Sequence, residues 1–261
     1  MARLARIDIH PVKSLDPQTV EQAVLLASGA LANDRRFALR DREGQFITGK
    51  RTPAVHVLRS QFDPATNRLA LRVEDLTETH TFDVDTQRPE LSRFLSDYFA
   101  MPLEFVENSW AGFPDDTDSP GPTVISTATL AEVATWFPGL SIDEVRRRFR
   151  ANLEIEGVEA FWEDRLVAEE ARVVRFQIGA AELLGTNPCQ RCAVPSRNPY
   201  TGETIREFAK IFSNRRQESL PDFSAASRFD HFYRLAVNTR PARVEPSTIR
   251  VGDEVRVLGM E

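Results

Sequence analysis

Short stretches in which apolar and polar residues alternate are the feature that most constrains the fold of this chain. Residues 5–9 read Ala-Arg-Ile-Asp-Ile, and Leu69, Leu71 and Val73 repeat the pattern. A period of two places alternate side chains on one face of a strand, so each stretch predicts a half-buried strand. Residues 37–48 contain two such stretches around a Glu-Gly turn, which predicts a hairpin. Several short strands separated by turn residues favour a small barrel or sandwich.

Helical spacing begins further along the chain. Residues 91–99 place Leu91, Phe94, Leu95, Tyr98 and Phe99 at intervals of three and four, which predicts an amphipathic helix with an aromatic inner face. Thr129 with Glu132, and Ser141 with Glu144, resemble capping boxes that open two more helices. A fourth helix is expected around residues 205–212.

Strand patterns return in the second half, at residues 152–156 and 172–184, and residues 249–257 predict a hairpin around Gly252-Asp253. The predicted class is therefore a β-rich α+β protein. The stretch from Gly112 to Thr123 is rich in Asp, Pro and Gly and is the best candidate for a linker. We place a domain boundary there, which gives domains at 1–118 and 119–261.

Charge and hydropathy exclude several classes of protein. The 261 residues carry a net charge of −6, which disfavours a nucleic-acid-coating protein, and the run 146–150 is better interpreted as a solvated helix face in which only Arg150 is a functional candidate. The mostly apolar stretch 23–32 is too short to span a bilayer, and the N-terminus lacks the apolar region of a secretory signal. We expect a cytoplasmic protein without nucleic-acid or membrane partners.

The two cysteines, Cys189 and Cys192, are the strongest candidates for chemistry. A structural zinc site needs four ligands, and His231 is too distant in sequence to complete a compact one. A thioredoxin-type pair begins a helix, which Pro195 and Pro199 prevent here. Two small buried thiols remain an alternative. Against it, residues 185–202 are dense in turn-forming and polar residues, as in an exposed functional loop.

Cationic and neutral donors elsewhere could join these thiols. Arg191 lies beside Cys192 in sequence, and a neighbouring cation favours the thiolate that binds soft metals. The other candidates are donors suited to a phosphate-bearing cofactor: Lys13, Ser14, Arg35, Arg150 and Asn152. Singly, each is more simply a surface charge or a cap, and spacing alone does not show that they converge.

The order of motifs along the chain resembles the MOSC family. The motifs are Pro11 to Ser14, Gly29 to Arg35, Phe149 to Asn152, Glu163-Asp164, Cys189-x-x-Cys192 and Val251 to Asp253. The match is closest to two-part members with an N-terminal MOSC β-barrel domain, similar to the mitochondrial amidoxime reducing component and its bacterial relatives. This resemblance implies a MOSC β-barrel domain, a smaller N-terminal β-barrel-like domain, and a molybdenum cofactor held between them.

The resemblance also implies roles for particular residues. Cys192 matches the family's molybdenum ligand, and Asp164 matches an acidic position near the metal that would donate a proton. The positions that match the binding site for the pterin and its phosphate are Lys13, Ser14, Arg35, Arg150 and Asn152, together with Ser126 and Thr127 at a helix start.

The implied activity is that of a molybdenum-cofactor-dependent oxidoreductase that reduces N-hydroxylated small molecules. Electrons would come from a separate donor protein of the ferredoxin or flavoprotein type. A cofactor or sulfur carrier without turnover, and a structural protein with reduced cysteines, are the alternatives. The chain departs from the family's Val-Asp-Pro-Asp-Thr-Gly, which here reads Arg-Asn-Pro-Tyr-Thr-Gly from Arg197 to Gly202, and Lys50 stands where relatives often carry arginine.

Overall fold

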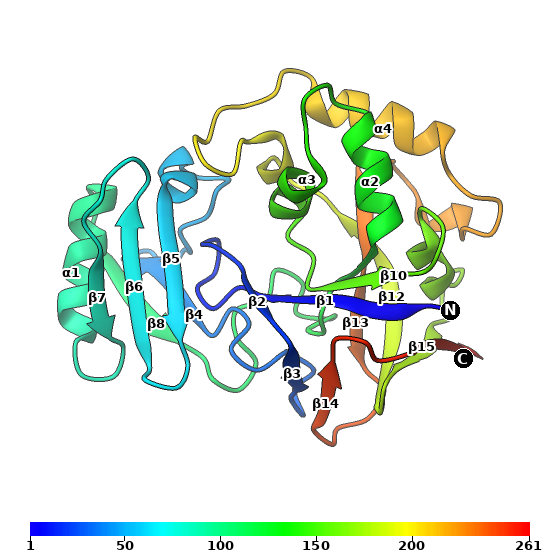
Figure 1. Cartoon of the computed structure of the whole chain (residues 1–261), viewed down its shortest axis with the longest axis horizontal. Coiled ribbons are helices and arrows are strands. Elements are labelled where there is room, and N and C mark those ends of the chain that lie inside the picture. Colours follow the sequence, from blue (N-terminus) through cyan, green and yellow to red (C-terminus); the bar gives the residue numbers. More distant parts are fainter.

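The computed structural model describes residues 1–261, and its main element is an eight-stranded sheet. The strand order is β15-β11-β12-β13-β9-β10-β1-β2, and only β9 and β10 pair in parallel. The strands are β1 (Arg3–Ile9), β2 (Gln18–Val20), β9 (Val124–Ser126), β10 (Leu153–Glu156), β11 (Val174–Ile178), β12 (Ala181–Gln190), β13 (Arg234–Pro241) and β15 (Val255–Met260). The sheet therefore joins the first strands of the chain to its last ones (Figure 1).

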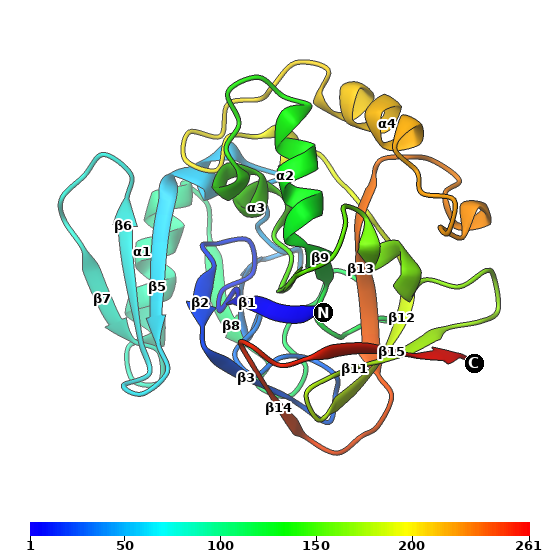
Figure 2. The ribbon, with the colours of Figure 1, turned by 45° about the vertical axis from the view of Figure 1, so that its right-hand side comes forward.

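The sheet curls until β1 meets the start of β15 (Figure 2). Leu4 N donates to Asp253 O at 2.9 Å, and Gly252 N donates to Leu4 O at 2.7 Å. Contacts of this kind join the two sides of the curl over a few residues, but the strands do not form a closed barrel. Beside the curl, β3 (Gln22–Leu25) pairs with β14 (Ser247–Arg250).

The remaining strands form a separate lobe at the left of Figure 1. In this lobe β4 (Phe37–Asp41) pairs with β8 (Leu103–Glu107), and β5 (Leu58–Asp63), β6 (Arg68–Val73) and β7 (His80–Asp83) form a three-stranded sheet. The helix α1 (Arg88–Phe99) buries Leu91 and Leu95 against it, and a short helix, η1 (Pro53–Val57), precedes β5. One core cluster consists only of residues between Val12 and Phe105, so the lobe has its own hydrophobic core.

Three α-helices lie above the large sheet in the view of Figure 1. They are α2 (Thr127–Thr135), α3 (Ile142–Phe149) and α4 (Phe208–Glu218), with the short helices η2 (Trp162–Leu166), η3 (Val194–Ser196) and η4 (Ala226–Arg228) between them. Side chains of these helices and of adjacent strands form another core cluster, in which Phe137 stacks on Phe208 with ring centroids 4.2 Å apart. No helix of the chain combines the length and the apolar character needed to cross a bilayer.

The fold confirms the predicted β-rich α+β class, with 21% helix and 33% strand. The strands predicted at 5–9 and 69–73, the helix at 91–99 and the Ser141 cap are all present. The boundary at 118/119 stays a prediction, because β1, β2 and β3 share sheets with strands of the second half.

Three local predictions are wrong. Residues 249–257 do not pair with one another, because β14 joins β3 while β15 joins β11. The second helix starts one turn earlier than its apparent capping box, since Ser126 caps it by accepting from Thr129 N. The fourth helix starts at Phe208 and not near residue 205.

Candidate functional site

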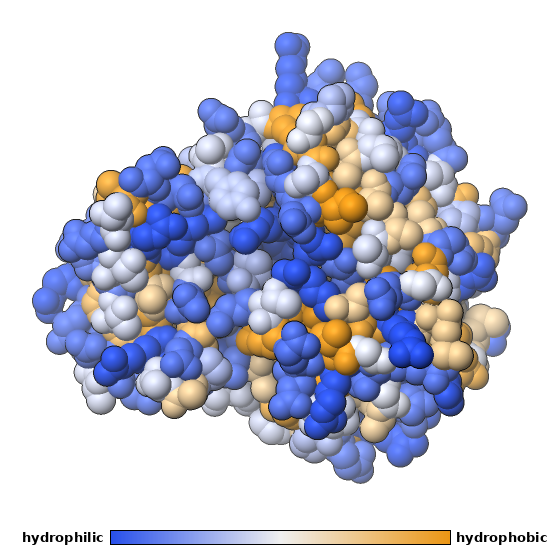
Figure 3. Space-filling view, in the orientation of Figure 1, coloured by the Kyte–Doolittle hydropathy of each residue, from blue (hydrophilic) through white to orange (hydrophobic).

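A cavity of about 850 Å³ lies where the lobe meets the large sheet. The space-filling view shows a recess lined by hydrophilic residues in this region (Figure 3). Residues from both halves of the chain form its walls, from Lys13 in the loop after β1 to Asn238 on β13. The site is therefore assembled from distant parts of the sequence.

Positive charge dominates this cavity. Eleven Lys and Arg side chains line it against four Asp, a formal excess of seven positive charges in a chain whose net charge is −6. The cations are Lys13, Lys50, Arg35, Arg59, Arg147, Arg148, Arg150, Arg191, Arg197, Arg228 and Arg234, and the acids are Asp16, Asp34, Asp115 and Asp116. Such a concentration of cations suits an anionic ligand.

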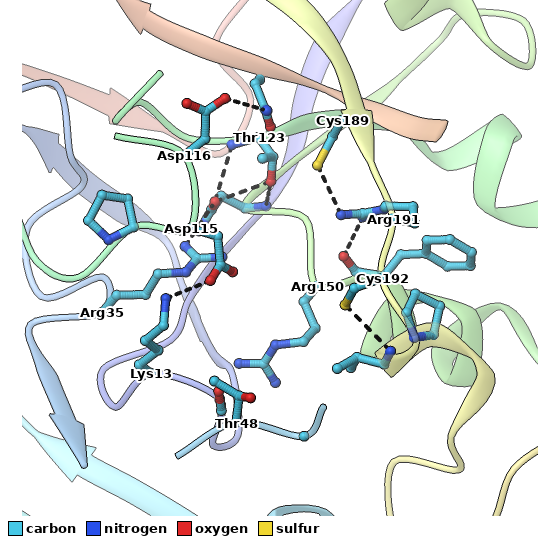
Figure 4. A pocket seen from close by; sticks show the side chains of 18 of the residues that line it. Lys13, Arg35, Thr48, Asp115, Asp116, Thr123, Arg150, Cys189, Arg191 and Cys192 are labelled. Carbon is cyan, nitrogen blue, oxygen red and sulfur yellow. Dashed lines mark hydrogen bonds and ion pairs between the residues drawn. The ribbon is translucent and has the colours of Figure 1, made fainter. Parts of the chain in front are cut away.

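Lys13 and Arg35 form one wall of the cavity (Figure 4). Lys13 Nζ donates to Phe113 O at 2.9 Å and to Asp115 Oδ1 at 2.6 Å. Burial lowers the pKa of Lys13, and Asp115 only partly offsets that effect. Arg35 forms an ion pair with Asp34 behind it, so each predicted cation of this wall already has one carboxylate.

Arg150 projects into the cavity without a carboxylate partner (Figure 4). Its Nη2 donates to Leu15 O at 2.7 Å, and that is its only side-chain hydrogen bond. Burial and the nearby charge of Arg35 lower its pKa from 12.5 to about 10, so it remains a cation at neutral pH. Arg150 is thus a desolvated charge that a bound anion would stabilise.

Three of the predicted cofactor-binding residues have positive φ angles, 74° at Ser14, 49° at Arg35 and 55° at Arg150. Such angles are uncommon in residues other than glycine and carry a conformational cost. All three residues line the cavity, and Arg150 is also the left-handed C-cap that ends α3.

Asn152 also lines the cavity, but its amide is already engaged. Its Oδ1 accepts from Thr123 N at 3.1 Å, and its Nδ2 donates to Asp8 O at 3.0 Å. Arg35 Nη1 lies 3.5 Å from the same Oδ1. Asn152 is therefore placed to position Arg35 and the Thr123 backbone, and its predicted contact with a cofactor stays a prediction.

The two cysteines form the facing wall and have different surroundings (Figure 4). Both are free thiols. Arg191 Nη1 donates to Cys189 Sγ at 3.2 Å, whereas Cys192 Sγ accepts from Val194 N at 3.5 Å. Arg191 therefore contacts Cys189 and not Cys192, its neighbour in sequence, and its effect on the Cys192 thiolate stays a prediction. Cys189 is the second-last residue of β12 and Arg191 directly follows the strand, and side chains two positions apart along a strand share a face.

Ser126 and Thr127 lie outside the cavity. Ser126 is fully buried, and its Oγ is 2.8 Å from Thr129 Oγ1 while it also caps α2. Its backbone N donates to Glu163 Oε2 at 3.2 Å. The start of α2 is thus closed by a carboxylate of the protein, and the predicted phosphate contact of Ser126 and Thr127 is not supported.

Asp164 likewise lies outside the cavity. Arg216 Nη2 donates to both of its carboxylate oxygens, at 2.8 and 2.6 Å, and Ser224 Oγ donates to Oδ2 at 2.7 Å. Asp164 and Arg216 are both buried. Asp164 is thus engaged by Arg216 outside the cavity, so its predicted proton-donor role is not supported.

The segment predicted as a linker, residues 112–123, supplies several cavity-lining residues that were not predicted as site residues. Asp115, Asp116 and Thr123 all line the cavity, and Asn238 Nδ2 donates to Asp116 Oδ2 at 3.1 Å. Turn-rich composition showed that this stretch is a loop, but it gave no sign of what the loop contacts.

The donor set fits a molybdenum cofactor better than a metal held by the protein alone. No group of three or more His, Cys, Asp and Glu residues in the chain could hold a metal ion. One thiol from Cys192 or Cys189, together with the unpaired Arg150 and the other cations of the cavity, suits a soft metal that arrives on an anionic cofactor with its remaining ligands.

Comparison with known proteins gives the family. A search of curated proteins found no match. Among solved structures, the YUAD protein from Bacillus subtilis is similar at 11% identity and a TM-score of 0.39, over 98% of this chain and 94% of that one. The MOSC N-terminal beta barrel domain matches residues 1–101, and the MOSC domain matches residues 123–256. MOSC domains are molybdenum cofactor sulfurase C-terminal-like domains, associated in general with binding that cofactor. Because the two matches span most of its length, the chain belongs to the MOSC family.

Proposed function

We propose that this protein binds a molybdenum cofactor in the cavity and acts as an oxidoreductase that reduces N-hydroxylated small molecules. The observation that carries the proposal is the convergence of Lys13, Arg35 and Arg150 with Cys192 around one cavity. These residues lie far apart in sequence. Their common location is what binding of an anionic cofactor with a soft metal requires.

The chain's own residues would hold and orient the cofactor. Cys192 would supply a thiolate ligand, supported by the Val194 N–H. Arg150 would pair with an anionic group of the cofactor, and Lys13 and Arg35 would do so beside their present carboxylates. When bound, the cofactor supplies two-electron redox chemistry. Reduction of an N–OH group consumes two electrons and two protons and releases the oxygen as water.

The electrons would come from a separate donor protein of the ferredoxin or flavoprotein type. The 261 residues contain two cysteines, fewer than the four thiolates that hold a typical iron–sulfur cluster. We place this chemistry in the cytoplasm, where both thiols would stay reduced.

Metal content tests the cofactor. Protein purified from a host that makes the molybdenum cofactor should contain molybdenum, Cys192→Ala should contain none, and Cys189→Ala should lose part of it. The two variants are matched controls for each other, since both remove one thiol of the same loop. Equal and complete loss in both would show that Cys192 is not the single ligand, and a metal-free wild type would end the proposal.

Turnover separates an enzyme from a carrier. We expect the molybdenum-loaded protein to reduce benzamidoxime with a chemical electron donor, and the Cys192→Ala variant to have no activity. Stable molybdenum binding without any turnover would favour the alternative, a carrier of the cofactor.

A further inference from the structure

One end of the cavity is bordered by basic side chains that the cofactor proposal does not use. We call Lys50, His56, Arg59, Arg147 and Arg197 the cationic rim. All five line the cavity. Lys50, His56 and Arg59 lie in or near η1 and β5 of the lobe, whereas Arg147 lies on α3 and Arg197 directly after η3. The rim therefore forms where the two halves of the chain meet.

Hydrogen bonds from both halves of the chain hold the backbone of residues 195–199, which carries Arg197. Arg148 Nη1 donates to Pro195 O at 3.0 Å and to Arg197 O at 2.5 Å. From the lobe, Arg59 Nη2 donates to Pro199 O at 3.2 Å. The backbone around Arg197 is thus held from both sides, which fixes where its side chain enters the cavity.

The rim carries more positive charge than its acidic neighbours neutralise. Arg59 lies 3.3 Å from Asp16 and 3.0 Å from Glu74, and Arg147 shares Asp16 at 4.0 Å. Neither Lys50 nor Arg197 has a carboxylate within ion-pair distance, although Arg197 Nη1 donates to Gly202 O at 3.3 Å. Two cations of the rim are therefore free to pair with a ligand.

Two buried nitrogen atoms of the rim have neither a hydrogen-bond partner nor a carboxylate at ion-pair distance, Arg197 Nε and His56 Nε2. Burial and the charges of Arg150 and other arginines lower the pKa of His56 to about 4, so His56 is neutral at pH 7. Gly49 makes room beside it, because a Cβ at residue 49 would lie 2.7 Å from His56 Nε2. Unpartnered buried polar atoms destabilise the folded protein, so a ligand that pairs with them is favoured.

We propose that the cationic rim selects substrates that carry a carboxylate, and that Arg197 is the residue that binds this group. The planar guanidinium of arginine matches a carboxylate with two parallel hydrogen bonds. Lys50 follows Gly49, which lies beside His56, so it adds a second charge from the lobe side of the cavity. The inference rests on the proposed function in one respect, namely that the reducible group of the substrate lies deeper, toward Cys192.

Kinetics on a matched pair of substrates test the rim. For the loaded protein, kcat/KM for 4-carboxybenzamidoxime should exceed that for benzamidoxime by at least tenfold, mainly through KM. Arg197→Gln should lower this ratio about tenfold, and Lys50→Gln, on the opposite wall, should lower it less. Arg206→Gln is the control, since Arg206 is exposed and does not line the cavity. A wild-type ratio near one, or a ratio unchanged by Arg197→Gln, would overturn the inference.

Binding without turnover keeps the two proposals distinguishable. Calorimetry with benzoate and benzamide should show tighter binding of benzoate to the wild type, in metal-free and loaded protein, and Arg197→Gln should remove the difference. Preferential benzoate binding without any benzamidoxime reduction would refute the proposed activity and support the rim. If Arg197→Gln instead loses its molybdenum, the rim holds the cofactor's own phosphate and the inference fails.

Discussion

Two arginines of this protein show opposite ways of keeping a charge away from water. Arg216 on α4 is fully buried, makes two hydrogen bonds to Asp164, and lies over the Phe161 ring with its guanidinium carbon 4.3 Å from the ring centroid. Arg150 is partly buried at the cavity, lacks a carboxylate, and donates only to Leu15 O. One cation is neutralised within the fold, whereas the other is not.

The comparison teaches that pairing, more than burial, separates structural charges from functional ones here. Removal of one partner from a buried ion pair strongly destabilises the fold, because it leaves an uncompensated buried charge. A desolvated cation without a partner costs stability and is retained where a ligand supplies the missing charge. Three predictions test this distinction, in order of their expected effect on stability.

The largest effect should come from breaking the Arg216–Asp164 pair. We expect Arg216→Met to lower the free energy of unfolding by about 3–5 kcal/mol, because Asp164 would remain buried and unpaired. Urea unfolding followed by fluorescence measures the change. The control is Arg215→Met, since Arg215 lies next to it on α4 but is exposed and pairs with exposed Glu218.

The companion variant Asp164→Asn tests the role that the resemblance implied for this acid. We expect it to be destabilised in the same assay. If this variant instead kept its stability and lost turnover, Asp164 would be a proton donor, and the Arg216–Asp164 pair would not be a structural one.

The second effect concerns Glu163, whose Oε2 accepts from Thr129 Oγ1 at 3.0 Å while Oε1 has no partner. Burial and the charge of Asp164 raise its pKa from 4.5 to about 7. The folded protein thus retains a proton that the unfolded chain releases above pH 4.5. The contribution of Glu163 to the free energy of unfolding therefore falls as the pH rises from 4.5 to 7, and it stays constant above pH 7.

Because of Glu163, we expect the free energy of unfolding of the wild type to fall by about 2–3 kcal/mol from pH 5 to pH 8. Glu163→Gln cannot titrate and should lose that part of the pH dependence. Glu170→Gln, at an exposed site, is the control and should retain it. The comparison is urea unfolding of the three proteins at both pH values, and identical pH profiles would contradict the buried, protonated state.

The sequence predicted elements better than contacts between them. Strand β6 was predictable because Leu69 and Leu71 repeat with the period of a strand, and both are fully buried. The hairpin at 249–257 failed because the pattern of a strand does not name its partner, and β14 and β15 pair elsewhere. Local signals specify conformation, whereas pairing depends on the whole sheet.

The site shows the same limit. Residue type made Lys13, Arg35 and Arg150 candidates, the resemblance assigned them to one site, and they do line one cavity with both cysteines. Sequence adjacency assigned Arg191 to Cys192, although the period of an extended chain would have indicated Cys189. The cationic rim had no signal in spacing, because Lys50, His56 and Arg59 come from the other half of the chain than Arg197.

The smallest effect on stability, and one of opposite sign, should come from Arg150. The fold lowers its pKa from 12.5 to about 10, which means that the charged form is disfavoured in the folded state at neutral pH. Arg150→Met removes that cost but leaves Leu15 O without its donor, a loss of about 1 kcal/mol. We therefore expect an unfolding free energy equal to the wild type or higher by about 1 kcal/mol.

The same substitution should greatly reduce binding of anions. Molybdenum content after gel filtration should fall at least fivefold in Arg150→Met, and calorimetry should show weaker binding of inorganic phosphate to the metal-free protein. Arg150→Lys keeps the charge but not the planar guanidinium. Its molybdenum content and phosphate binding should therefore lie between those of the wild type and those of Arg150→Met. If Arg150→Met were destabilised as strongly as Arg216→Met, Arg150 would serve the fold, and the absence of a carboxylate beside it would not mark a ligand site. Gain or retention of stability together with loss of anion binding is the combination that only an unpaired, ligand-directed charge explains.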